Sequence, residues 1–194
     1  QPEYLDVYQR HNQRVWAEFE RGEVTSVGLR TKRFRLLFEE IASSLDPELV
    51  SPIYLRNLAL GAHLLDGALE VIHALHTTYC LALVTNGLAD VQRPRLEQSL
   101  LHDAFEEVFI SEEIGAAKPE RTYFDAIFRR IGQPPKERVL IIGDSLTSDM
   151  QGGIDYGIHT CWYNPKRKTT SLPVTYQVTH LSQLPALLDG NSLH

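Results

Sequence analysis

Long apolar runs are missing from this sequence, as are cysteine-rich segments and any excess of cationic residues. No stretch approaches the ~20 apolar residues that a membrane-spanning helix requires, which argues against a transmembrane segment. Only two cysteines occur, Cys80 and Cys161, both beside apolar residues, and we expect buried thiols in a reducing, cytoplasmic compartment. With 19 Lys and Arg against 25 Asp and Glu, the net charge of −6 disfavours nucleic-acid polymers and membrane surfaces as partners.

Helix signals dominate residues 1–64. Thr25 or Ser26 can cap a second helix after an initial one, and Asp46-Pro47 is typical of the start of a third. Apolar residues recur at helical spacing, so we expect the three helices to pack as a small bundle. The residues predicted to face inward include Leu5, Val15, Leu29, Leu45, Leu49, Ile53 and Leu58. We therefore predict a helical domain over residues 1–64.

From residue 65 onward, helical and strand-like patterns alternate. Short apolar segments are expected to form strands ending near Thr85, and at 107–111, 139–143, 159–163 and 176–178. Helices are expected between them, one of which runs to Leu101 and another from Glu120 to Ile131. Such alternation predicts an α/β fold with a doubly wound parallel sheet over residues 65–194.

Two carboxylates follow the most apolar of these strands. The segment from Val139 to Asp149 breaks at Gly143 and brings Asp144 and Asp149 to the start of a helix. Ligands of open α/β sheets bind at the carboxyl ends of the strands. Two neighbouring carboxylates repel each other unless a cation lies between them, and Mg²⁺ prefers such oxygen ligands. The alternative is that Asp144 caps the helix and Asp149 favours its dipole.

A second polar strand end is formed by Thr85, Asn86 and Gly87. Thr85 can donate its hydroxyl, and the Asn86-Gly87 turn can direct backbone N–H groups at an anion. Asn-Gly is also a strong hairpin signal, but the following residues are charged and helix-like, which favours a strand–loop–helix reading.

Lys118 precedes Pro119, which we expect at the first position of the next helix. This arrangement would place an ammonium group at a helix N-terminus, where phosphate groups also bind. A solvated loop is the ordinary alternative for an isolated Lys-Pro pair.

Taken in this order, the segments that carry Thr85, Lys118, and Asp144 with Asp149 resemble the haloacid dehalogenase superfamily of phosphohydrolases. Members carry a Thr or Ser after the second core strand, a Lys before a later helix, and Gly-Asp-x-x-x-x-Asp or a close relative after the fourth. The segments 110–119, 143–153 and 160–164 are similar to those of the YjjG-like pyrimidine 5′-nucleotidases.

The resemblance implies an HAD-like α/β core with a helical cap and Mg²⁺-dependent hydrolysis of phosphate monoesters through an aspartyl-phosphate. Thr85 and the N–H groups of Asn86 and Gly87 would bind phosphoryl oxygens, Lys118 would neutralise charge, and the acidic pair would hold Mg²⁺. It implies a pyrimidine nucleoside 5′-monophosphate as the small-molecule substrate. The alternatives are a sugar phosphate or phosphoglycolate, or a non-catalytic binding module. A response-regulator receiver is disfavoured because its Lys-Pro follows every acidic residue.

One element of the superfamily pattern has no match. Its first strand carries Asp-x-Asp, which supplies the nucleophile and the general acid, and no Asp-x-Asp occurs in the 194 residues. No residue present here is therefore assigned as nucleophile. We expect a preceding segment of roughly 30 residues that holds this motif on a strand and connects to the cap.

Overall fold

The structure of the protein is a computed structural model that describes residues 2–190. The chain forms two compact units, each described separately below. The helical unit comprises Gln1–Gly61 and Gly87–Arg95, and the sheet unit comprises Ala62–Asn86 and Leu96–His194. The domain boundary at residues 64 and 65 stays a prediction. No helix among residues 2–190 is long and apolar enough to cross a membrane.

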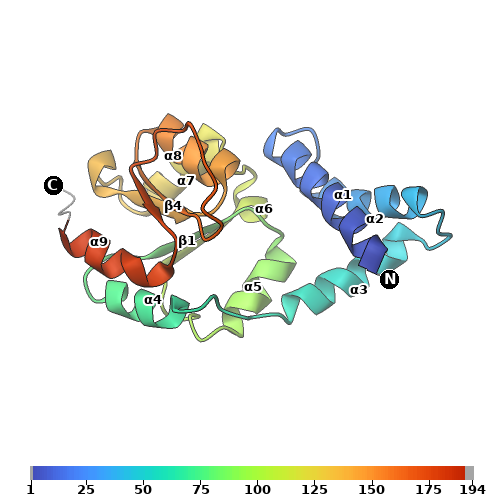
Figure 1. Cartoon of the computed structure of the whole chain (residues 1–194), viewed down its shortest axis with the longest axis horizontal. Helices are drawn as coiled ribbons and strands as arrows, with labels where there is room; N and C mark the ends of the chain where they lie inside the picture. Colours follow the sequence, from blue (N-terminus) through green and yellow to red (C-terminus); the bar gives the residue numbers. More distant parts are fainter. Residues whose placement is uncertain (1, 191–194) are drawn as a thin grey trace. The chain divides into compact units, whose positions relative to one another are not determined.

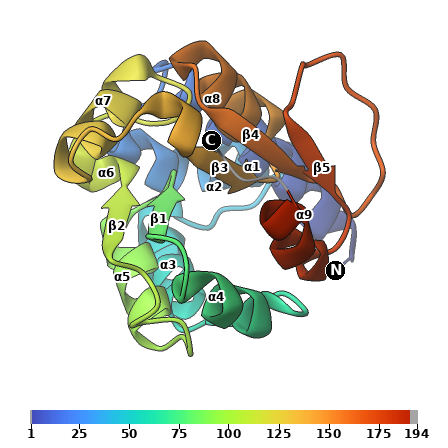
Figure 2. The ribbon, with the colours of Figure 1, turned by 90° about the vertical axis from the view of Figure 1, so that its left-hand side faces the viewer.

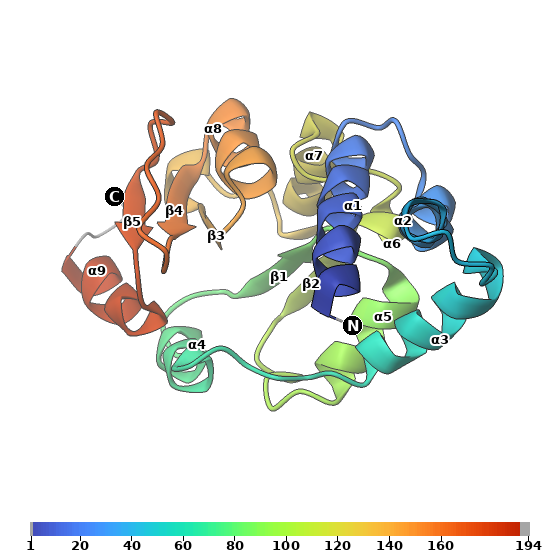
Figure 3. The same cartoon turned by 45° about the vertical axis from the view of Figure 1, so that its right-hand side comes forward.

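The helical unit contains the helices expected near the start of the chain, together with a segment that comes later in the sequence (Figures 1 and 3). Its helices are α1 (Pro2–Glu20), α2 (Ser26–Glu40), α3 (Pro47–Ala59) and most of α5 (Ala89–Glu97). Thr25 caps α2 by accepting the Gly28 N–H at 3.2 Å, and Asp46 caps α3 by accepting the Glu48 N–H at 2.9 Å. These side chains satisfy helix-terminal donors that would otherwise lack a partner.

The predicted inward face of the bundle is partly wrong. Leu5, Leu45, Leu49, Ile53 and Leu58 are exposed. Helix α3 instead buries the small side chains at positions 51 and 59 together with the leucine at position 55. These positions recur every four residues and therefore share one helix face. The core of α1 and α2 follows the prediction more closely, because Val15 and Leu29 are fully buried.

The sheet unit contains two parallel sheets. Strand β1 (Ala82–Thr85) pairs with β2 (Glu107–Ile110), and β3 (Leu140–Gly143), β4 (His159–Tyr163) and β5 (Tyr176–Val178) form the second sheet. The register places Thr85 opposite Ile110 and Gly143 opposite Trp162. Within residues 2–190, no strand pairs with the free edge of β1 or of β3. Because every pair is parallel, the carboxyl ends of the strands within each sheet lie together.

Helices cover both faces of the three-stranded sheet, as expected for a doubly wound α/β fold (Figure 2). On one face, α4 (Ala68–His76) and α9 (Leu184–Gly190) pack around Cys161 and Val178. On the other face, α7 (Arg121–Arg130) and α8 (Gln151–Tyr156) pack around Ile141 and Trp162. The remaining short helices are α6 (Ser111–Ile114), η1 (Lys136–Arg138), η2 (Leu146–Met150) and η3 (Leu181–Gln183).

Three local expectations need correction. Cys161 is fully buried as expected, but Cys80, which lies in the turn before β1, is exposed. Helix α5 ends at Glu97 rather than Leu101, because the chain folds there into successive turns. Helix α7 begins at Arg121, so Pro119 is not its first residue. The Glu120 N–H instead donates to the Ala117 carbonyl at 2.8 Å, which closes a turn before the helix.

Candidate active site

The carboxyl end of β3 positions the two predicted acidic residues differently. Asp144 is exposed directly after the strand, whereas Asp149 lies in the η2 turn and is buried. Ser145 caps this turn by accepting the Ser148 N–H at 3.1 Å. Asp144 is therefore not the N-cap, and the helix-capping interpretation of this residue is wrong. Trp162 on the adjacent strand β4 donates its indole N–H to the Asp144 carbonyl at 3.1 Å, which ties the strand ends together.

Gly143 makes the position of Asp149 possible. A Cβ atom at residue 143 would lie 2.2 Å from Asp149 Oδ2 and 2.4 Å from its Cγ, so the carboxylate occupies the space that a side chain would fill. The Ser145 N–H donates to the same Oδ2 at 3.1 Å. The absence of a side chain at Gly143 thus lets the carboxylate fold back against the end of the strand.

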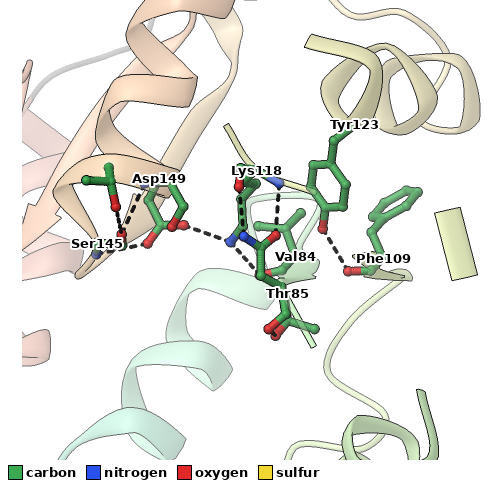
Figure 4. A network of polar contacts seen from close by, with 10 residues as sticks. Val84, Thr85, Phe109, Lys118, Tyr123, Ser145 and Asp149 are labelled. Carbon is green, nitrogen blue, oxygen red and sulfur yellow. Dashed lines mark hydrogen bonds and ion pairs between the residues drawn. The ribbon is translucent and has the colours of Figure 1, made fainter. Parts of the chain in front are cut away.

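Lys118 is the partner of this carboxylate. Its Nζ lies 2.7 Å from Asp149 Oδ1, and the two side chains are only 7% and 9% exposed. The same ammonium donates to the Val84 carbonyl of β1 at 3.2 Å. Lys118 therefore connects the ends of β1 and β3 (Figure 4), and the solvated-loop interpretation of this residue is wrong. A buried charge that loses its partner costs several kcal/mol, about 3–5 in typical cases, so this pair constrains the local structure.

The strand end at Thr85 lies beside Lys118. Asn86 pairs with the main chain of Lys118: its Nδ2 donates to the Lys118 carbonyl at 2.8 Å, and its Oδ1 accepts the Lys118 N–H at 2.9 Å. Thr85 is half-buried between Val84 and Asn86, the two residues that contact Lys118. Gly87 is the first residue of the later segment of the helical unit.

Three participants in this network were not identified from the sequence: the Val84 carbonyl, the Ser145 N–H and the phenol of Tyr123. Tyr123 is fully buried and donates to the Phe109 carbonyl at 2.9 Å (Figure 4). Burial, with a smaller effect from the Asp149 carboxylate, raises the pKa of Tyr123 far above 10.0, so the phenol remains a donor. Main-chain groups leave no mark in a sequence, but the preference for serine as an N-cap could have indicated Ser145.

The donor set fits a magnesium ion that uses few protein ligands. Asp144 presents an exposed carboxylate at the strand end, and the Asp149 carboxylate is folded against Gly143 close by in the chain. Among residues 2–190, no group of three or more His, Cys, Asp or Glu side chains forms a metal cluster. Mg²⁺ commonly binds through one or two carboxylates and completes its shell with water and substrate phosphate. The chemistry of these oxygen donors therefore suits Mg²⁺ better than a metal that needs a protein cage.

Comparison with protein families gives a match to haloacid dehalogenase-like hydrolases over residues 3–157. The HAD-hydrolase YfnB of Bacillus subtilis is 39% identical over 94% of this chain and 78% of its own length. The pyrimidine 5′-nucleotidase YjjG of Escherichia coli is 33% identical over 93% of this chain and 80% of its own length. The pyrimidine 5′-nucleotidase PynA of Streptococcus pneumoniae is 36% identical over 98% of this chain and 81% of its own length.

Solved structures give the same result for the fold. A crystal structure of YfnB from Bacillus subtilis bound to magnesium matches with a TM-score of 0.92 and 38% identity. The match covers 97% of this chain and 83% of that chain. An L-2-haloacid dehalogenase from Xanthobacter autotrophicus, at 15% identity, shares the fold with a TM-score of 0.79.

Proposed function

Because the chain belongs to the haloacid dehalogenase-like hydrolases, we propose that it functions as an Mg²⁺-dependent phosphatase acting on phosphate monoesters. The observation that carries this proposal is the buried pair of Lys118 and Asp149 beside the polar end of β1. An ammonium group fixed at the end of the strand that carries Thr85 suits the binding of a phosphoryl dianion, because charge-assisted hydrogen bonds are the strong ones.

Each residue of the site has a distinct task in this proposal. Thr85 and the main-chain N–H groups of Asn86 and Gly87 bind phosphoryl oxygens, and Lys118 neutralises negative charge as it shifts during the reaction. Preorganisation of such groups avoids reorganisation when the transition state forms. The nucleophile of an aspartyl-phosphate pathway is not assigned to any residue of this chain.

Asp144 and Asp149 would hold the magnesium ion, with Asp144 as the direct ligand because its carboxylate is exposed. Asp149 already accepts hydrogen bonds from Lys118 and from the Ser145 N–H, which suits a contact through the water shell of the ion. The bound ion supplies charge neutralisation and polarisation of the phosphoryl group.

We further propose a pyrimidine nucleoside 5′-monophosphate as the substrate. The support is the similarity to YjjG and PynA, both named pyrimidine 5′-nucleotidases, at 33% and 36% identity over most of the chain. Weaker similarity extends to an N-acylneuraminate-9-phosphatase from Mus musculus, over 66% of this chain, so sugar phosphates belong in any substrate test.

The test is a phosphate-release screen of the full-length protein against nucleoside monophosphates, sugar phosphates and phosphoglycolate, with Mg²⁺ and with EDTA. We expect Mg²⁺-dependent release, fastest from pyrimidine nucleotides. Lys118→Ala should lower kcat by about 100- to 1000-fold, the usual effect of losing one preorganised electrostatic group. The exposed Lys166→Ala serves as the control and should retain activity. Release that is unaffected by Lys118→Ala would contradict the site assignment, and faster release from sugar phosphates would contradict the substrate.

A further inference from the structure

The side chain of Asn86 is committed to the main chain of Lys118 rather than to open space. Its amide nitrogen donates to the Lys118 carbonyl at 2.8 Å, and its amide oxygen accepts the Lys118 N–H at 2.9 Å. This reciprocal pair imitates the way two peptide groups bond in a sheet. Both distances lie in the range of well-formed hydrogen bonds.

Lys118 is thereby held at both of its ends by residues that flank Thr85. Asn86 fixes its main chain, and the Val84 carbonyl accepts a hydrogen bond from its Nζ at 3.2 Å. The position of the ammonium group relative to the Thr85 hydroxyl is therefore set by β1 itself. Asp149, at 2.7 Å, supplies the charged contact from the other side.

Such fixing matters for lysine in particular. Its ammonium group sits on a flexible four-carbon stem, so the side chain alone does not define where the charge lies. An error of about 1 Å in the position of a reacting group can cost roughly 100-fold in rate. A main chain anchored two bonds from the start of the stem restricts the region that Nζ can reach.

We propose that Asn86 is a positioning residue, whose side chain keeps the Lys118 ammonium in register with the Thr85 hydroxyl so that one phosphoryl group contacts both. This inference deepens the proposed function and rests on it. The alternative is that the Asn86 side chain binds the substrate itself. The two hydrogen bonds to Lys118 already use the oxygen and one N–H donor of the Asn86 side-chain amide, which favours the positioning role.

The test is a double-mutant cycle in the full-length protein. Asn86→Ala should lower kcat for a nucleoside monophosphate by about 10- to 100-fold, with KM changed far less. In a Lys118→Ala background, the same substitution should lower kcat by less than about twofold, because the ammonium that it positions is gone. Asn86→Ser, which can retain one of the two bonds, should fall between the wild type and Asn86→Ala, and it replaces the alanine variant if that variant does not fold.

The chain offers a matched control. Asn164 makes the same reciprocal pair with another lysine, donating to the Lys168 carbonyl at 2.8 Å and accepting the Lys168 N–H at 3.0 Å. Asn164→Ala removes an equivalent pair of side-chain-to-main-chain hydrogen bonds from a loop outside the proposed site. It should lower the melting temperature about as much as Asn86→Ala does, with kcat within about threefold of the wild type.

Hydrogen–deuterium exchange tests, independently of activity, whether the Asn86 side chain restrains the main chain at Lys118. The segment 115–120 should exchange faster in Asn86→Ala than in the wild type, with no such change in Asn164→Ala. Losses that multiply in the double mutant, or a normal kcat in Asn86→Ala, would overturn the positioning role. A wild-type protein without phosphatase activity would contradict the proposed function and the catalytic part of this inference. Unchanged exchange at 115–120 in Asn86→Ala would overturn the claim that Asn86 restrains the Lys118 main chain.

Discussion

Replacement of Gly143 by alanine tests the construction of the site with the smallest possible change. The new methyl group would lie 2.2 Å from Asp149 Oδ2, far inside the 3.4 Å at which ordinary contact begins. The main chain at Gly143 is held by the pairing of its strand with β4. The Asp149 carboxylate must therefore be the group that moves, by more than about 1 Å. A movement of that size separates Asp149 from Lys118 and from the Ser145 N–H.

Two contributions set the size of the effect. Added volume in a well-packed site typically costs about 1–3 kcal/mol. Loss of one hydrogen bond to a charged group costs about 1.5–3 kcal/mol. This cost applies to the Lys118–Asp149 pair because both side chains are buried and water does not replace the lost partner. We therefore expect Gly143→Ala to lower the free energy of unfolding of the sheet unit by about 3 kcal/mol or more. The change should also lower kcat, because Lys118 loses its charged partner.

Urea denaturation of the full-length protein, followed by circular dichroism, measures the first effect, and phosphate release measures the second. Gly61→Ala is the matched control, since its new Cβ would meet only the Leu58 carbonyl, at 3.5 Å. That control should change stability by less than about 1 kcal/mol. Unaltered stability and turnover in Gly143→Ala would refute the packing of Asp149 against the strand end.

Three further predictions address the metal, the thiols and the acid response. Asp144→Asn should abolish Mg²⁺ binding measured by calorimetry while the circular dichroism spectrum is retained, and unchanged affinity would contradict its role as ligand. Burial raises the pKa of the Cys161 thiol to about 11, so iodoacetamide at pH 8 should leave Cys161 unlabelled until the protein unfolds. Cys80 is exposed and should be labelled, but slowly, because its pKa is also raised. Peptide mapping distinguishes the two sites. The Lys32 ammonium, 2.9 Å from Glu18 Oε2, lowers the pKa of Glu18 below 4.5. Stability that is present above that pH should therefore be lost as pH falls through the lowered value, and Lys32→Met should weaken this dependence in urea titrations.

The sequence predicts the strands and their polar ends well, because both depend on local pattern. The apolar runs before Thr85 and Asp144 form strands, as expected. Because ligands of open α/β sheets bind at the carboxyl ends of the strands, the sequence also predicts that the side chains following these strands are candidates for a site. Caps at Thr25 and Asp46 were also predictable, since each needs only a side chain and the next few N–H groups.

Features that depend on distant partners were not predictable in this way. The exposure of Leu49 and Ile53 follows from which face of α3 meets the other helices, and periodicity does not distinguish two faces that both carry leucine or isoleucine. The pairing of Asn86 with Lys118 joins residues 32 positions apart through main-chain atoms. Gly143 could be recognised as a strand end but not as the space that receives Asp149.

The indole of Trp162 lies next to the proposed magnesium ligand in the structure. Its ring is buried, and its N–H bonds to the carbonyl of Asp144, the proposed magnesium ligand. Indole emission depends on the polarity and hydrogen bonding around the ring, so a cation that draws on Asp144 should change the fluorescence directly. The other tryptophan of this chain, Trp16, belongs to the helical unit, and its replacement by phenylalanine would leave Trp162 as the chain's single reporter. We therefore expect Trp162 fluorescence to report magnesium binding at the proposed site without an attached dye.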